Sequence, residues 1–75
     1  MNQETIGHAA GVIWNRLNEA GEDGLSLSAV KKIPGIKSDE AVAALGWLSR
    51  EGKVEFESVK RAVRVSLVQN ELVTI

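Results

Sequence analysis

Residues 38–53, SDEAVAALGWLSREGK, read as one helix whose start, buried face and end are all present in the sequence. Ser38 is the candidate N-cap, because its side-chain oxygen can accept a hydrogen bond from an unpaired amide of the first turn. Gly52 is expected in the left-handed conformation that often follows a helix C-terminus. The helix has one apolar stripe at helical spacing, formed by Ala41, Leu45 and Leu48.

After Gly52 the hydrophobic period changes from that of a helix to about two residues, which is typical of β-strands. Residues 54–59 and 62–68 are predicted to form a hairpin with Lys60 and Arg61 at its tip. In that register Val54 faces Leu67, Phe56 faces Val65, Ser58 faces Val63 and Glu57 faces Arg64. Apolar therefore meets apolar and acid meets base. Because Lys-Arg lacks the Gly or Asn preferred in two-residue turns, a longer tip with the same parity is a second possibility.

Before this stretch, residues 3–20 form another helical pattern that ends at Gly21 and a polar turn over residues 22–24. Its expected apolar face consists of Ile6, Ala9, Ala10, Ile13, Leu17 and Ala20.

A shorter helix is predicted next. It follows a short extended piece at residues 25–27, which could add a third strand to the hairpin. Ser26 is its candidate N-cap, and Val30 and Ile33 are its inward residues. Pro34 and Gly35 should stop it sharply, which leaves a turn of about four residues before the next helix. This spacing is that of a helix-turn-helix.

The segment LSLSAVKKIPGIKSDEAVAALGWLSREGKVEFE, residues 25–57, resembles a winged helix-turn-helix, and ALGWLSREGKVEFE is similar to its helix-into-wing junction in small bacterial proteins. Over residues 3–68 the chain resembles a family of free-standing bacterial winged-helix domains of unknown function. The resemblance implies an α+β fold of three helices and a two- to three-stranded wing. It also implies a recognition helix over residues 38–51, which enters the major groove in DNA-binding members, and a wing tip at Lys60-Arg61 that touches the DNA backbone or the minor groove.

Length and composition indicate one small domain over residues 1–75, with a core at 3–68 and an apolar tail at 69–75. Hydrophobic residues make up 44% of the chain, and the absence of cysteine excludes disulfides and thiolate chemistry. No apolar run approaches the ~20 residues of a membrane span, and no signal peptide is evident, so we expect a cytoplasmic protein. The net charge of -1 is not that of a strong nucleic-acid binder.

Basic side chains gather in the second helix, the following turn and the wing, roughly where phosphate contacts would fall. These DNA-contact candidates are Lys31, Lys32, Lys37, Arg50, Lys60, Arg61 and Arg64. The outward arc of residues 38–51 offers only one arginine, and its first turn carries two acids, which disfavours direct base readout. An ordinary solvated surface explains the same lysines and arginines, and Arg64 is also claimed by Glu57.

A protein-interaction surface is the alternative. Tryptophan is enriched at interface hot spots, and small residues permit close approach. The candidates are Ala43, Gly46 and Trp47 on the recognition helix, Gly7, Gly11 and Trp14 on the first helix, and Leu72, Val73 and Ile75 in the tail. Core packing of either tryptophan, and close packing or simple tolerance of the two glycines, are the alternative interpretations. The tail could extend the sheet, fold onto the core or pair with a second copy.

Catalysis finds little support, because the single histidine, His8, falls on the polar face of the first helix and no metal-ligand spacing or phosphate loop is present. We therefore expect no enzymatic activity, no metal, no cofactor and no small-molecule substrate. The sequence predicts a regulatory, transcription-related module that is DNA-associated or protein-docking, and a homodimer.

Overall fold

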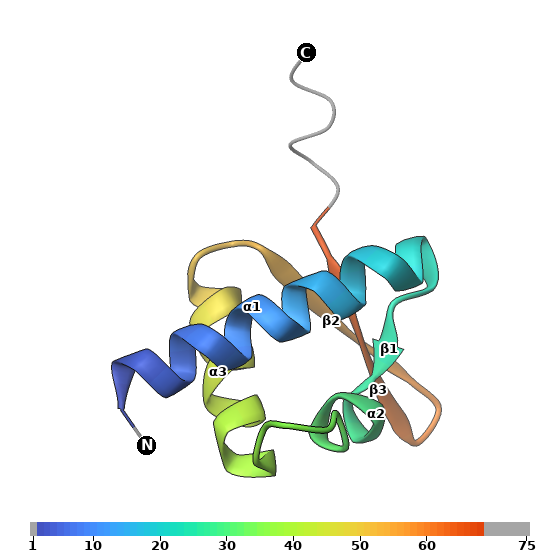
Figure 1. Cartoon of the computed structure of the whole chain (residues 1–75). Coiled ribbons are helices and arrows are strands. Elements are labelled where there is room, and N and C mark those ends of the chain that lie inside the picture. Colours follow the sequence, from blue (N-terminus) through green and yellow to red (C-terminus); the bar gives the residue numbers. More distant parts are fainter. Residues whose placement is uncertain (1, 69–75) are drawn as a thin grey trace.

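A computed structural model describes residues 2–68, and it contains three helices and a three-stranded antiparallel sheet (Figure 1). In chain order the elements are α1 (Gln3–Ala20), η1 (Gly21–Asp23), β1 (Leu25–Ser26), α2 (Leu27–Lys31), α3 (Ser38–Arg50), β2 (Val54–Val59) and β3 (Ala62–Leu67). The expected α+β winged helix-turn-helix architecture is confirmed, including the short third strand. The predicted tail, with Leu72, Val73 and Ile75, lies outside the described residues.

The sheet has the strand order β1-β3-β2, so β3 is the central strand. The β2–β3 register matches the predicted one at every pair, including Phe56 opposite Val65 and Glu57 opposite Arg64. The last pair is Val59 with Ala62, which leaves the two-residue tip Lys60-Arg61. The longer tip that the sequence left open is therefore not formed.

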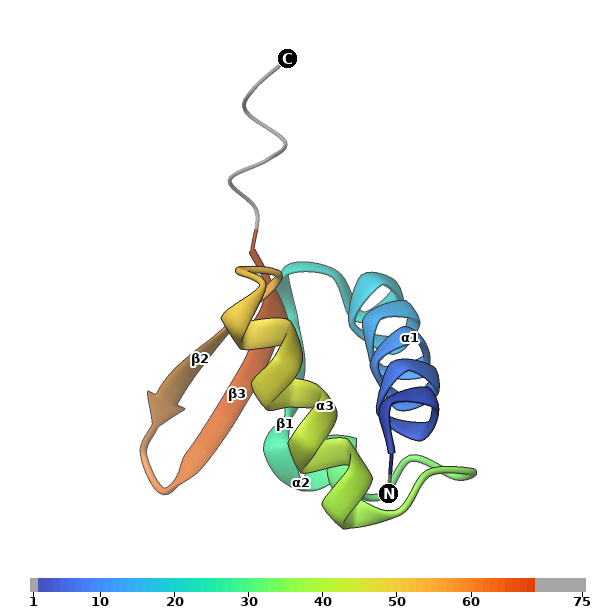
Figure 2. The same cartoon turned by 90° about the vertical axis from the view of Figure 1, so that its left-hand side faces the viewer.

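The core lies where α1, α2, α3 and the sheet meet, and Figure 2 shows α3 between the sheet and α1. Its members come from every α-helix and from the two long strands, so the core is shared among these elements. The buried hydrophobic residues are Ala9, Ala10, Ile13, Leu17, Val30, Ile33, Ala41, Ala44, Leu45, Leu48, Val54 and Val65. The stripe predicted for α3 is confirmed, and Ala44 belongs to it as well. In α1, Ile6 and Ala20 are only partly buried.

A tight turn after α3 sets the direction of the wing. Gly52 has φ 73°, as expected for the residue after the helix C-cap. The N–H of Gly52 donates to the Ser49 carbonyl at 3.0 Å, and the N–H of Lys53 donates to the Leu48 carbonyl at 2.9 Å. These two bonds are those of a Schellman motif, which satisfies the last carbonyls of the helix and turns the chain into β2.

The start of α3 differs from the prediction. Lys37, and not Ser38, occupies the N-cap position, while Ser38 is the first helical residue. The backbone N–H of Lys37 donates to the Glu40 carboxylate at 3.3 Å, and the Asp39 carboxylate accepts from the N–H of Glu40 at 2.9 Å. Two carboxylates thus satisfy backbone donors at this end, so a serine N-cap is not needed.

The second helix also ends earlier than predicted. Ser26 is its N-cap and accepts from the N–H of Ala29 at 3.1 Å, as expected, but α2 stops at Lys31, three residues before Pro34. Residues 32–37 connect it to α3, a longer turn than the four residues predicted. Ile33 is buried from this connection rather than from the helix. The chain leaves the helical path before the proline because the residue that precedes a proline is disfavoured in the helical conformation.

We expect Leu48→Ala to lower the free energy of unfolding by about 2–5 kcal/mol, because Leu48 is buried and its truncation leaves a cavity. Val42→Ala on the same helix is the matched control, since Val42 is 49% exposed and its truncation should change stability by less than about 0.5 kcal/mol. Urea unfolding followed by circular dichroism measures both. Equal effects of the two substitutions would contradict the assigned buried face of α3.

Backbone strain at the wing tip can also be tested. Lys60 has φ 57°, and among residues 2–68 no other residue except glycines has a positive φ. An L-residue is strained in this region, so Lys60→Gly should raise the free energy of unfolding by about 0.5–1 kcal/mol. Arg61→Gly at the neighbouring position, whose φ is not positive, should instead lower it by up to about 1 kcal/mol. Thermal and urea unfolding of both variants gives the sign, and a loss of stability in Lys60→Gly would refute strain at the tip.

Candidate functional site

The described surface has two candidate interaction regions. The first, the basic wing surface, comprises the residues that the sequence proposed for phosphate contact, namely Lys31, Lys32, Lys37, Arg50, Lys60, Arg61 and Arg64, all of which are exposed. The second, the tryptophan groove, runs between α1 and α3 and is lined by Gly7, Ala10, Gly11, Trp14, Asn15, Trp47, Leu48 and Lys53.

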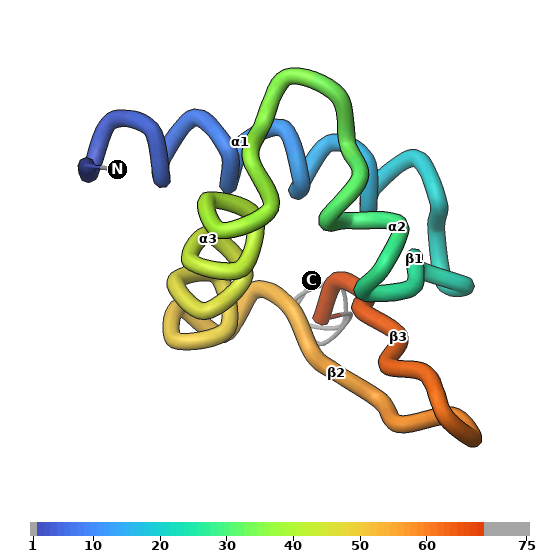
Figure 3. Tube along the Cα trace, turned by 90° about the horizontal axis from the view of Figure 1, so that it is seen from below, coloured from blue at the N-terminus to red at the C-terminus, as the bar shows by residue number. Residues whose placement is uncertain are grey.

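In the basic wing surface, the wing tip projects from the same side of the molecule on which α2 and β1 lie (Figure 3). Lys31 and Arg61 line the same hollow of about 300 Å³, together with the hydroxyl-bearing Ser26 and Ser28. The tip itself adds Lys60, while Lys37 lies apart at the N-cap position of α3. The structure thus brings together cations from a helix and a hairpin that are separated in sequence.

Two residues of the basic wing surface lie away from the hollow that Lys31 and Arg61 line. Arg50 is in the last turn of α3, at the opposite end of that helix from Lys37. Arg64 lies opposite Glu57 in the sheet and lines a different hollow, which it shares with Asp23. Each therefore stands apart from the pair formed by Lys31 and Arg61.

The exposed face of α3 is poorly equipped to read bases. Val42 is 49% exposed and Trp47 is 47% exposed, and Gly46 between them has no side chain. The sequence placed Glu40 and Ala43 on the outward face of α3, but both side chains are half-buried. Val42, which the sequence analysis did not single out, is exposed instead. Apolar side chains of this kind offer no hydrogen bonds to base edges, which are best read by Arg, Lys, Asn or Gln.

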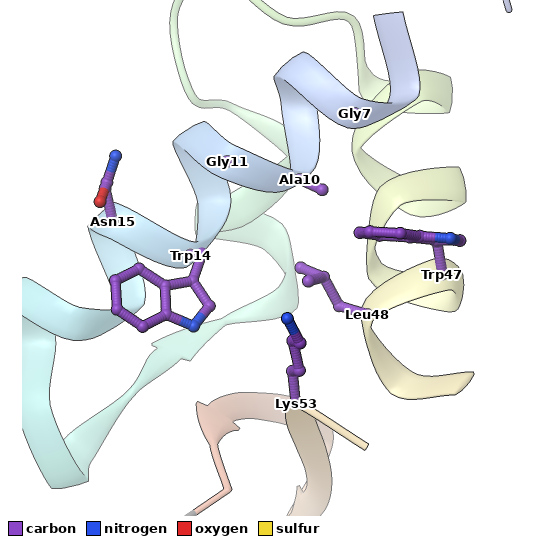
Figure 4. A pocket seen from close by; sticks show the side chains of 8 residues that line it. All are labelled: Gly7, Ala10, Gly11, Trp14, Asn15, Trp47, Leu48 and Lys53. Atoms are coloured by element: carbon purple, nitrogen blue, oxygen red, sulfur yellow. The ribbon is translucent and has the colours of Figure 1, made fainter. Parts of the chain in front are cut away.

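The tryptophan groove is shallow along α1 and has an indole at each side (Figure 4). Trp14 projects from α1 and Trp47 from α3, while the buried Ala10 and Leu48 lie between them. Lys53 closes one end with its ammonium directed into the groove. Trp14 is 39% exposed. The core-packing interpretation of the two tryptophans is therefore wrong.

The glycines of α1 keep the groove open. A Cβ atom built on Gly7 or on Gly11 would meet no heavy atom within 4 Å, so neither glycine is required for close packing inside the domain. Each weakens an exposed helix by roughly 1 kcal/mol relative to alanine. Of the interpretations left open by the sequence, close internal packing is excluded.

Chemistry-bearing clusters are scarce in residues 2–68. No group of three or more His, Cys, Asp or Glu side chains in this range could hold a metal ion. His8 is exposed on α1, as expected for a solvated helix residue. Within the same range, no helix has the length and apolar character needed to cross a lipid bilayer.

Val42 and Lys53 are among the residues of these surfaces that the sequence analysis did not single out, for different reasons. Val42 falls on the helical wheel beside the inward stripe, and only the observed position of the sheet shows that its flank is uncovered. Lys53 follows the glycine that ends α3, and its place in the groove depends on the Schellman turn. The glycine signal in the sequence could have located this turn, but not the direction of the lysine side chain.

Comparison with known proteins gives a family and a similar structure. Residues 1–67 match the family model described as "Winged helix-turn-helix domain (DUF2582)". The fold is similar to the solution NMR structure of protein BT2368 from Bacteroides thetaiotaomicron, with 27% identity, a TM-score of 0.75, and coverage of 99% of this chain and 87% of that one. No match was found among the curated proteins.

We expect Gly11→Ala to raise the free energy of unfolding by about 0.5–1 kcal/mol, because the methyl group meets open space and alanine favours the helix. The comparison variant is Gly24→Ala, which should be strongly destabilising, since Gly24 has φ 64° and its added Cβ would collide with the Val65 carbonyl oxygen. Thermal unfolding distinguishes the two. A destabilised Gly11→Ala would mean that this part of α1 is covered in the folded protein.

Proposed function

The chain belongs to the winged helix-turn-helix family described by the matching model, and from this membership we propose that it is a regulatory module that associates weakly with duplex DNA through phosphate contacts. The contacts are made by the wing tip and the adjoining end of α2. The observation that carries the proposal is the convergence of Lys31 and Arg61 on one hollow.

Several features support phosphate contact at this end. Lys31 and Arg61 are exposed, and the serine hydroxyls beside them can donate further hydrogen bonds to phosphate oxygens. Lys60 places a cation at a positive-φ position that glycine would fill with less strain, so charge is present there at the expense of stability. A lysine and an arginine at the tip thus fit a backbone-contacting wing.

Weak binding without strong base preference is the form of association that the charges support. The whole chain carries a net charge of -1, so long-range attraction to DNA is small. The exposed face of α3 presents Val42, Gly46 and Trp47, which supply no base-specific hydrogen bonds. Phosphate contacts position a protein on the duplex but carry no sequence information, so selectivity would come from a partner protein or from DNA shape.

A second candidate function is protein docking at the tryptophan groove. Two half-exposed indoles beside open glycines are the observation that favours it, because large aromatic side chains dominate interface energetics. A second copy bound through this groove would give the expected homodimer. Sedimentation velocity over a range of protein concentration distinguishes monomer from dimer and needs no knowledge of the partner.

The DNA proposal predicts a salt-dependent affinity for random-sequence duplex. Each phosphate neutralised contributes about -0.9 to the slope of log affinity against log salt concentration, so Lys60→Glu with Arg61→Glu should abolish measurable binding at moderate salt. If residual binding is measurable at low salt, its slope should be smaller by about 2. Fluorescence anisotropy of labelled duplex at several salt concentrations gives both quantities.

The matched control carries the same change in charge outside the proposed contact. Arg16 lies exposed on α1 and Lys53 lies in the tryptophan groove, so Arg16→Glu with Lys53→Glu alters net charge equally. This control should keep most of the affinity. Equal losses in the two double variants would mean that only net charge matters, and full binding by the wing variant would remove the wing from the contact.

A further inference from the structure

We propose that the outer edge of β2 binds an extended segment of another protein in which basic residues alternate with apolar ones. Such a segment would add one more strand to the sheet, a mode of recognition in which backbone hydrogen bonds give affinity and alternate side chains give specificity. The inference concerns a surface that neither the proposed DNA contact nor the tryptophan groove uses, and it does not rest on either of them.

β2 has an edge that no other strand covers. The strand order β1-β3-β2 places β2 at one side of the sheet, and among residues 2–68 it pairs only with β3. Figure 2 shows β2 as the outermost strand, with its outer side turned away from α1. β2 has six residues, whereas β1 at the other edge has two. The sheet therefore offers its longer open edge at β2.

The hydrogen-bonding pattern identifies the backbone groups that point to this edge. The N–H of Val68 donates to the carbonyl of Lys53 at 3.0 Å, so these two residues form a bonded pair. Because bonded and non-bonded pairs alternate along an antiparallel ladder, every second residue from Lys53 onward bonds to β3. Phe56 and Ser58 belong to the other set and direct their N–H and C=O groups outward. These groups are the ones that a further strand would bond.

The two faces of the edge differ in chemistry. Phe56 lies on the face that also carries the buried Val54, yet it is itself 46% exposed. Glu55 and Glu57 lie on the opposite face, and both are exposed. Residues directly opposite each other in an antiparallel pair have neighbouring side chains. An added strand would therefore place an apolar residue beside Phe56 and basic residues beside the two acids.

The same acids disfavour a second copy of the chain. Pairing of two β2 strands about Phe56 would set Glu55 of each copy opposite Glu57 of the other, and like charges directly opposite are destabilising. Sliding the strands by two residues in either direction sets one of the two acids opposite its counterpart in the other copy. A basic residue gives attraction instead, most of all opposite Glu55, because its neighbour in β3 is the neutral Ser66.

Protection of a bare edge is the alternative explanation of the two acids. Charged side chains on an edge strand hinder aggregation, so protection alone would account for Glu55 and Glu57. It would not account for Phe56, because an exposed aromatic ring beside open backbone groups promotes association. The ring, the open backbone groups and the acids together fit a bound strand.

The test uses the peptide acetyl-TVKVKVT-amide, whose central valine lies opposite Phe56 in the proposed register and whose lysines lie opposite the two glutamates. The full chain labelled with nitrogen-15 is titrated with it and observed by NMR. At millimolar peptide, the amide signals of Phe56 and Ser58 should shift and their hydrogen exchange should slow by about fivefold, because these amides gain a partner. The amides of Glu55 and Glu57 already bond to β3 and should change less.

Methylated peptides test the backbone contact directly. Methylation of the central valine amide should weaken binding by about tenfold, because it removes the donor to the Phe56 carbonyl and blocks the edge. The matched control is methylation of a lysine amide in the same peptide. That N–H points away from β2, so the affinity should change little.

Charge reversal tests the preference for a basic partner. Glu55→Lys with Glu57→Lys should lose the affinity for TVKVKVT and gain affinity for TVEVEVT. The control, Glu19→Lys with Glu22→Lys, makes the same change in net charge at exposed positions outside the sheet and should keep the original preference. The amide spectrum of each variant verifies that it is folded.

The possible results separate the proposal from its alternatives. Shifts that alternate along β2, together with the reversed preference, support it. The absence of shifts at millimolar peptide overturns it and leaves the acids as protection of a bare edge. Equal weakening by the two methylations overturns strand addition. Slow exchange of the Phe56 and Ser58 amides that grows with protein concentration, without peptide, also overturns it, because a second copy would then cover the edge.

Discussion

The turn that follows α3 is the constraint on which the rest of the structure depends. Its two hydrogen bonds, from Gly52 to Ser49 and from Lys53 to Leu48, end the helix and aim β2 away from it. Because Val54 is buried directly after this turn, the direction of β2 also decides which face of the wing meets the core. Lys53 in turn accepts the hydrogen bond from Val68, so the same turn fixes where the chain leaves the sheet. A residue with a Cβ atom in place of Gly52, at φ 73°, would strain this connection.

The exposed side chains of α3 differ from those that read base edges. Asp39 and Glu40 carry negative charge at the end that enters the major groove in DNA-binding relatives of this fold, yet both carboxylates serve the helix by accepting backbone N–H groups. Cations lie instead on α2 and at the wing tip, and the one arginine of α3, Arg50, is in its last turn. An arrangement with acids on the helix and bases on the wing suits contact with a phosphate backbone better than contact with base edges. The fold alone would not have distinguished these modes, since one architecture supports many functions.

The sequence predicted the parts of the structure that depend on local pattern. The register of the hairpin followed from alternation, because a shift of one residue would have moved Val65 from the core to solvent. The end of α3 followed from one glycine. What the sequence could not predict depends on neighbours that are distant in the chain. A helical wheel shows that Trp14 and Trp47 flank the buried stripes, but only the spacing of α1 and α3 decides whether those flanks are covered. By contrast, the early end of α2 has a local cause, because the residue that precedes a proline is disfavoured in the helical conformation.

Departures from the locally best residue coincide with the two candidate surfaces. Gly24 and Gly52 have positive φ angles and are explained by the backbone. Gly7 and Gly11 are different, since they lie inside α1 over open space, where alanine would stabilise the helix. Lys60 is the converse case, a side chain held where glycine would relax the turn. In a chain of 75 residues, which can bury only a small core, such choices are expected to be significant. A sequence tends to violate its local preferences where function requires it, and here the violations fall in the groove between α1 and α3 and at the tip of the wing.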